Sequence, residues 1–319
     1  MRTTRRRLLQ AGLAVPAATA AGATWARPAE AEPGDNHGYD RRMWPVTTTE
    51  ADWAPVAQAL GRVGRLLDGG RAYRVSFPRR DLTVVSHGVT VRPALALSSY
   101  AAFSRYHDDR VLVMGDLAVT EAELPVVTDL AQGTGLAQTA IHKHLLAHEP
   151  QLWWTHIHAL GDPVAAARAV RATLDGTGTP PGLPPDTAPG DLDAAAVDRV
   201  LGRSGSWDGG VYRFTIARRE TITDHHRVLT PGMGPTTVLG FQPTGGGHAV
   251  VNGDVAMRPG EVQAVIRALR SGGVSVVELH HHMLHDHPHL FYLHFWARGD
   301  ALDAARTLRD AVDATHTAD

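Results

Sequence analysis

The chain repeats itself, and this constrains its fold more than any other feature of the sequence. Residues 111–118 (VLVMGDLA) resemble residues 249–256 (AVVNGDVA), 138 positions further on, and no gap is needed to carry His142 onto His280 or His156 onto His294. Upstream, 73–80 resembles 212–219 one residue out of step, which would place His87 on His226. A sequence made of two copies predicts two units of the same fold.

The boundaries follow from the repeat and from a segment rich in proline and glycine, which disfavours regular structure. We expect a leader over 1–31, a tether and the start of a first helix over 32–59, and a linker over 175–195. The first repeat unit is expected over 60–174 and the second over 196–315.

Each unit has the same order of patterns: a β-rich start, a helix, two strands and a closing helix. Thr120 and Glu123 have the spacing of a capping box, and Asp162 and Asp300 suit the N-caps of the closing helices. The sequence therefore predicts an α+β fold, a tandem duplication with mainly antiparallel sheets and helices on one face.

Composition excludes several classes of protein. A net charge of −2 gives no reason to expect nucleic acid as a partner. After the N-terminal segment there is no uncharged apolar run of the length that crosses a membrane. Cysteine is absent, so disulfides, thiolate metal sites and a lipidated cysteine are excluded. The sequence gives no indication of an oligomeric state.

The N-terminus matches a twin-arginine export signal. Residues 4–9 (TRRRLL) precede an alanine-rich stretch over 11–26, with small-residue cleavage sites after it. An ordinary basic secretory leader is the alternative. We expect the twin-arginine machinery as a partner, and a soluble mature protein in the cell envelope or outside the cell, without a lipid anchor.

Histidines are concentrated in two short windows. Twelve of the 19 histidines lie at positions 142, 144, 148, 156, 158, 280, 281, 282, 285, 287, 289 and 294. Alternate residues of a strand share a face. A hairpin turning near Pro150 would place His144 opposite His156 and His142 opposite His158.

In the second unit the corresponding hairpin turns near Pro288. His282 would then lie opposite His294, and His280 opposite Trp296, with Glu278 on the same face. Each unit is thus expected to gather imidazoles on one face.

These residues have the chemistry of a metal site. His280, His282 and His294 with Glu278 make a set of three imidazoles and one carboxylate, which suits a divalent transition metal. Zn is favoured, and Cu, Fe or Mn are alternatives. The first unit offers His142, His144, His156 and His158, as a second site or as the opposite wall of one cleft. A metal-free cleft lined by histidine, or a chance clustering, remain alternatives.

Other residues are weaker candidates. Asp116 and Asp254 each follow a glycine, which is typical of a bulge or tight turn, or they deliver a carboxylate to the cleft. His87 and His226 are further possible ligands. The Arg-Arg-acid runs at 79–81 and 218–220 suit surface ion pairs or the binding of an anionic substrate.

Five segments resemble the LppY/LpqO-type family, whose domain (DUF1259) has no assigned function. They are VMGDL (113–117), AIHKHLL (140–146), THIHALGD (155–162), ELHHHML (278–284) and LHFWARGD (293–300). The resemblance implies a two-copy envelope protein and brings no activity. The chain departs from it by lacking a lipidated cysteine, and by Lys143 and His281 where asparagine is expected.

The leading hypothesis is an exported, metal-dependent enzyme, a hydrolase or lyase that acts on a small polar molecule or an envelope polymer. Glu278 and His158 are the candidates for acid–base work. The alternatives are a non-catalytic metal-binding or sensory envelope protein, and a metal-free binding cleft.

Overall fold

The computed structural model describes residues 42–182 and 190–318, which lie in one compact unit. The predicted leader, the first part of the tether and the middle of the linker lie outside the described residues. Among the described helices, none has the length and apolar character needed to cross a membrane.

The first half forms a six-stranded antiparallel sheet. Its order is β1-β2-β5-β6-β9-β7. The strands are β1 (Arg65–Leu67), β2 (Ala72–Pro78), β5 (Ser98–Arg105), β6 (Val111–Thr120), β7 (Ala137–His142) and β9 (Leu152–Gly161).

The second half repeats this sheet strand for strand, in the order β10-β11-β14-β15-β18-β16. The strands are β10 (Ser206–Asp208), β11 (Val211–Ala217), β14 (Thr236–Gly245), β15 (His248–Met257), β16 (Ser275–His280) and β18 (Phe291–Asp300). The prediction of a duplicated α+β unit with antiparallel sheets is confirmed.

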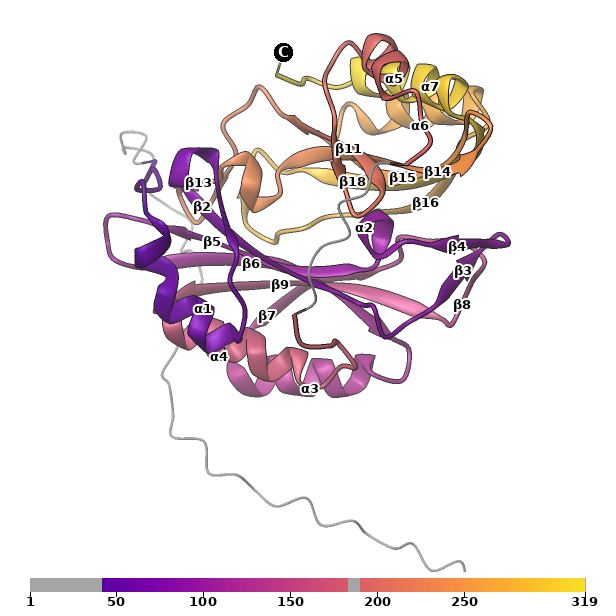
Figure 1. Ribbon diagram of the computed structural model, residues 1–319. Coiled ribbons are helices and arrows are strands. Elements are labelled where there is room, and N and C mark those ends of the chain that lie inside the picture. The colour runs from indigo at the N-terminus through magenta and orange to yellow at the C-terminus, as the bar shows by residue number, and fades with distance from the viewer. Residues whose placement is uncertain (1–41, 183–189, 319) are drawn as a thin grey trace, which may run out of the picture. The chain divides into compact units, whose positions relative to one another are not determined.

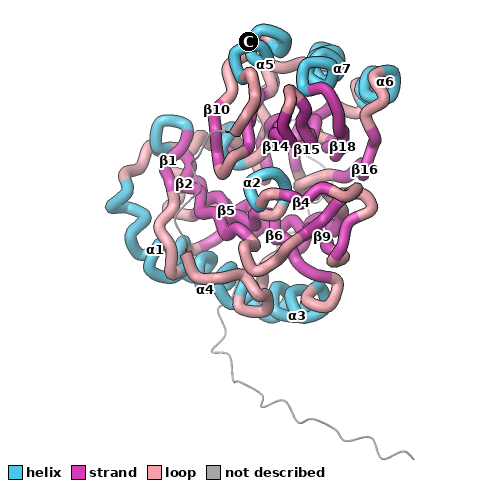
Figure 2. The backbone as a smooth tube through the Cα atoms, turned by 45° about the vertical axis from the view of Figure 1, so that its right-hand side comes forward, coloured by secondary structure: helices cyan, strands magenta, loops and turns pink. Residues whose placement is uncertain are grey.

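Helices cover the outer face of each sheet, so the two sheets lie between two helical layers (Figure 1). Figure 2 shows the same arrangement in a second view. The longer helices are α1 (Ala54–Leu60), α3 (Leu124–Thr134) and α4 (Pro163–Leu174) in the first half, and α5 (Ala194–Leu201), α6 (Val262–Ser271) and α7 (Ala301–Asp313) in the second. Short turns of helix are η1 (Glu50–Trp53), η2 (Asp68–Gly70), α2 (Pro93–Ala96) and η3 (Pro231–Met233).

The helix ends are where the sequence predicts them. Asp162 and Asp300 accept hydrogen bonds from backbone N–H groups of the first turns of α4 and α7. Thr120 and Glu123 exchange the two hydrogen bonds of a capping box just before α3. These local bonds fix the direction in which each helix leaves its strand.

Two small three-stranded sheets complete the fold. One contains β3 (Val84–Ser86), β4 (Val89–Val91) and β8 (His148–Glu149), and the other β12 (Thr223–Asp224), β13 (Arg227–Val228) and β17 (Asp286–His287). Their hairpins turn through two residues of positive φ, His87 and Gly88 in one and His225 and His226 in the other. His87 therefore corresponds to His225, and its predicted match with His226 is wrong.

Among the described residues, one apolar cluster belongs to the second half and two others combine both halves. The first lies between the second sheet and its helices. One mixed cluster packs Met114 with Leu229 and Tyr292, and the other packs Trp154 with Val250 and Trp296. The inner faces of the two sheets thus bury apolar surface against each other, which is the main force for association.

Arg79 and Arg218 stabilise equivalent corners of the two halves. Each arginine side chain is 1% exposed and pairs with two carboxylates. Arg79 pairs with Asp81 and Glu123, and Arg218 pairs with two glutamates of the second half. The predicted surface ion pairs are therefore buried ones. Since each charge is fully paired, these corners offer no free site for an anion.

Candidate metal centre

Six histidines from both halves meet between the sheets. This six-histidine cluster consists of His142, His144, His156, His280, His282 and His294. Its three closest ring pairs all join one half to the other: 3.9 Å for His142–His280, 3.9 Å for His144–His294 and 4.0 Å for His156–His282. The repeat relates these pairs by a pseudo-twofold axis, so six of the eight residues in the two predicted sets lie together in one cluster.

Ligand atoms within the cluster come close together in groups of three. The ligand atoms of His142, His144 and His294 lie within 4.8 Å of one another. We call this the first triad. The other close group in the cluster is His142, His156 and His280, which shares His142 with the first. The repeat relates the first triad to His280, His282 and His156, which we call the second triad, although these three are not one of the groups within 4.8 Å. Each triad takes two rings from one half and the third from the other.

Backbone carbonyls orient the rings of the two central strands. His156 on β9 donates from Nδ1 to the Gly115 carbonyl at 3.2 Å, and His294 on β18 donates from Nδ1 to the Gly253 carbonyl at 3.0 Å. Because a carbonyl only accepts, Nδ1 carries the proton and Nε2 is left with a free lone pair. Both Nε2 atoms are buried without a hydrogen-bond partner. Metal-binding histidines are commonly held in this way.

Further ring nitrogens of the cluster are also unpartnered. His142 Nδ1 and both nitrogens of His280 are buried without a hydrogen bond among the described residues. With the two Nε2 atoms above, that makes five. Buried polar atoms are nearly always satisfied, and an exception calls for an ion or a water. The donor set therefore fits a metal.

The protonation state also suits a metal. Burial lowers the pKa of His144 to about 3 and that of His156 to about 4, and it holds the pKa of the other four rings well below the usual value. The rings are thus neutral at pH 7, as metal ligands must be.

A carboxylate lies beside each triad. Asp116 Oδ2 is 3.2 Å from His144 Nε2, and Asp254 Oδ2 is 3.5 Å from His282 Nε2. Burial raises the pKa of both carboxyls, that of Asp254 to about 7. Both residues lie inside strands β6 and β15, so the turn interpretation is wrong, and the delivery of a carboxylate is what the geometry supports.

The glycines before these aspartates have a steric reason. A Cβ at Gly115 would lie 2.4 Å from the Tyr100 carbonyl oxygen, and one at Gly253 would lie 1.9 Å from that of Val238. Both distances are far inside van der Waals contact. The glycines let neighbouring strands approach closely beside the cluster.

The predicted strand pairing is wrong, although the strands exist. In the first half Ala140 lies opposite His156 and Trp154 opposite His142, and in the second half Glu278 lies opposite His294. The register differs by four because the connection between the paired strands is not a hairpin: it contains β8 in the first half and β17 in the second. A bulge in each first strand shifts the pairing beyond it by one further residue. His144 and His282 lie beyond the strand ends, where they reach the other half.

Glu278 has a different contact from the one expected. Its carboxylate accepts a hydrogen bond at 2.7 Å from the backbone N–H of Lys143 in the other half. Ala140 stands at its counterpart position. The three groups of close ligand atoms among the described residues do not include Glu278.

Three other predicted residues lie outside the cluster. His158 follows His156 on β9 but bonds Asp224 of the second half, with Nε2 to Oδ2 at 2.5 Å. The ring of His87 is 5.9 Å from that of Trp296, and His226 is exposed in its turn. Sequence reasoning missed Asp224 and His225, for which the only signal is their position beside His226.

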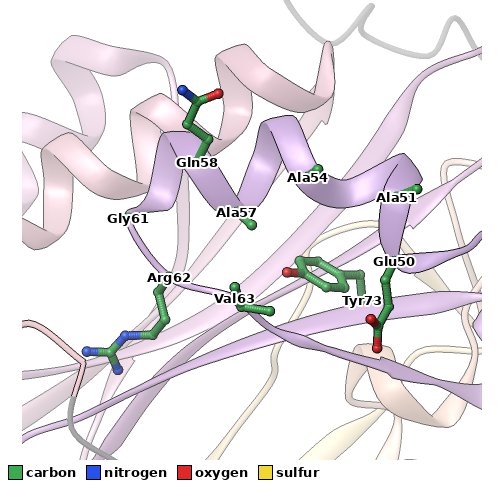
Figure 3. A pocket seen from close by; sticks show the side chains of 9 residues that line it. All are labelled: Glu50, Ala51, Ala54, Ala57, Gln58, Gly61, Arg62, Val63 and Tyr73. Carbon is green, nitrogen blue, oxygen red and sulfur yellow. The ribbon is translucent and has the colours of Figure 1, made fainter.

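A shallow pocket lies elsewhere, over α1 (Figure 3). Glu50, Arg62, Val63 and Tyr73 border it, together with small residues of α1. None of its lining residues belongs to the six-histidine cluster.

Comparisons with known proteins give a family without an activity. A family model described as "Domain of Unknown Function (DUF1259)" matches residues 54–176 and 195–314, which include all six histidines. No curated protein matches.

Solved structures with some likeness are microcompartment shell proteins. They are a double-ringed trimeric shell protein of the RMM microcompartment (16% identity, 64% of this chain and 81% of that one, TM-score 0.18), the trimeric shell protein PduB (12%, 79% and 90%, 0.21) and a fused permuted hexameric shell protein (16%, 65% and 81%, 0.17). At these TM-scores the likeness carries no argument.

Proposed function

Because the chain belongs to the DUF1259 family, whose description assigns no activity, we propose from the site itself that this protein binds divalent transition metal ions between its two halves. The observation that carries the proposal is the pair of carbonyl-anchored rings, His156 and His294, whose buried Nε2 atoms have no partner.

The donor set favours particular metals. Imidazole nitrogens with a carboxylate suit Zn, and also Cu, Fe or Mn, whereas ions that prefer all-oxygen ligands fit poorly. The first triad would be completed by Asp116 and the second by Asp254. Three imidazoles and one carboxylate make a closed set of four protein ligands, which is typical of structural or storage sites.

A non-catalytic metal-binding or sensory role is therefore our first proposal. The burial of the rings favours it, since the His142 ring has no exposed surface and His156 and His294 are each 4% exposed. In this role the chain's own residues hold the ion away from water and join the two halves around it.

A metal-dependent hydrolase or lyase is the second candidate. It is favoured by His144, whose side chain is 15% exposed and so the most exposed of the six. A metal there would polarise a carbonyl or acidify a bound water. A small polar molecule or an envelope polymer would be its substrate.

Export belongs to the same proposal. The twin-arginine pattern over 4–9 lies outside the described residues but suits a protein that folds around its ligand before transport. Because both triads use rings from both halves, the ion would be held only by the folded chain. We propose that the mature protein acts in the envelope or outside the cell.

Metal analysis of protein purified after native export tests the proposal. We expect wild-type protein to contain stoichiometric metal, and His294→Ala to lose the ion of the first triad. His248→Ala is the matched control, because His248 is an exposed histidine on the neighbouring strand β15. Metal-free wild-type protein, or full metal in His294→Ala, would overturn the proposal.

A second measurement separates the two roles. In Co²⁺-substituted protein, added azide changes the visible spectrum only where the metal has an open position. An unchanged spectrum supports the closed, non-catalytic site, and a changed spectrum supports the enzyme.

A further inference from the structure

A second group of ligand-type side chains lies beside the six-histidine cluster, and the cluster does not use it. His158 on β9, Asp224 on β12 and His225 in the following turn offer two ring nitrogens and a carboxylate oxygen that lie within 4.8 Å of one another. Asp224 joins the two rings, with Oδ2 at 2.5 Å from His158 Nε2 and Oδ1 at 3.1 Å from His225 Nδ1.

We propose that His158, Asp224 and His225 form a separate, solvent-accessible site for a divalent transition metal of the zinc class. Two imidazoles and one carboxylate are the protein ligands of open metal sites, which leave a position for water. Ligand atoms on a tetrahedral ion at ~2.0–2.1 Å stand ~3.3 Å apart. The shortest of the present contacts would lengthen by under ~1 Å to admit the ion.

The exposure of these residues differs from that of the cluster. The Asp224 carboxylate is 1% exposed, but the side chains of His158 and His225 are 13% and 29% exposed. His285, which is exposed, packs edge-on against His225 with ring centres 4.7 Å apart. The carboxylate is thus fixed in the protein while the imidazoles face solvent, so an ion could enter and leave without unfolding.

The His158–Asp224–His225 set has no counterpart at the positions that the repeat relates to it. The repeat carries Asp224 onto Ser86, His225 onto His87 and His158 onto Trp296. There the ring of His87 lies 5.9 Å from that of Trp296, with no carboxylate at the position of Asp224. Because both hairpins have the same turn, with φ 47 at His87 and at His225, the turn does not require the His–Asp–His set.

The alternative is a purely structural role. Asp224 comes from the second half and His158 from the first, so their hydrogen bond also joins the halves. A structural pair predicts a loss of thermal stability on substitution and no uptake of metal. A metal site predicts uptake of one ion that depends on the same residues.

The test is a metal titration of the full-length mature protein after brief treatment with EDTA. A brief treatment strips the accessible site first, whether or not the buried cluster contains metal. Zn²⁺ is then titrated by calorimetry into wild type, Asp224→Asn, His225→Ala and His87→Ala. His87→Ala is the matched control, since His87 is the same residue type in the equivalent turn.

We expect wild type and His87→Ala to bind one Zn²⁺ with equal affinity. Asp224→Asn and His225→Ala should bind it at least about 100-fold more weakly, since loss of an outer-shell partner alone costs up to that factor. No rapid uptake in wild type, or equal uptake in both variants, would overturn the proposal. His225→Ala covers the case in which Asp224→Asn fails to fold, because the His225 side chain is 29% exposed.

Discussion

Removing the metal from the six-histidine cluster should lower the melting temperature of the protein by about 10 °C or more. Five buried ring nitrogens of the cluster have no hydrogen-bond partner. Each unsatisfied buried polar atom costs about 1–3 kcal/mol. A metal bonds one nitrogen of each ring, so ions in the two triads would satisfy four of these five atoms and stabilise the folded state by about 4 kcal/mol at the lower end.

Two independent relations support this magnitude. A ligand at about 1,000 times its Kd stabilises the folded state by about 4 kcal/mol. In a chain of this size, 1 kcal/mol changes Tm by about 2–4 °C. Together, the two relations give a change in Tm of about 10 °C.

The assay is differential scanning calorimetry of protein purified with its metal, before and after prolonged chelation. We expect the full shift in wild type and in His248→Ala, and about half of it in His294→Ala, which leaves the second triad complete. A shift below about 2 °C in wild type would refute the reasoning, because the unpartnered nitrogens would then have been satisfied without metal.

Two further predictions concern the pH dependence of the metal-free protein and the packing at two glycines. Burial keeps the pKa of His144 at about 3 and that of His156 at about 4, below their unfolded values, so their contribution to stability is lost as the pH falls from about 6.5 towards 4. Asp254, with its pKa raised to about 7, opposes this, since its contribution is present below about pH 4 and is lost as the pH rises to 7. Because six rings outweigh two carboxyls, the urea midpoint of the metal-free protein should rise between pH 4 and 6.5. The rise should be less steep in His144→Gln. A midpoint that does not change with pH would contradict this prediction. Gly115→Ala should lower the free energy of unfolding by several kcal/mol, because its Cβ meets the Tyr100 carbonyl oxygen, whereas Gly133→Ala, in α3 with nothing within 4 Å, should raise it by about 0.5–1 kcal/mol. Equal urea midpoints for these two variants would contradict the steric argument.

Local features of the fold could be predicted from the sequence because their causes are local. The repeat at a constant step revealed the duplication, and capping residues such as Asp162 and Thr120 located the helix starts. Strand periodicity placed His142 and His156 on strands. Each of these inferences needs only a few neighbouring residues.

The composition of the site could not be predicted in the same way, because it depends on packing between distant segments. Periodicity gives the face of a side chain but not the strand register, and the long connection between β7 and β9 separates His142 from its expected partner His158. The pairing of His144 with His294 arises only when the inner faces of the two sheets meet. Asp224 and His225 gave no periodic signal.

The exchange of rings between the two halves has a consequence for a chain without cysteine. An ion bound by His144 and His294 would cross-link positions about 150 residues apart, and its counterpart at His156 and His282 would close a loop of about 126. By the loop-closure relation used for disulfides, a covalent link of this span removes about 5 kcal/mol of entropy from the unfolded chain. Coordination would thus give this protein a reversible staple, opened by a chelator or by acid where a disulfide would need a reductant.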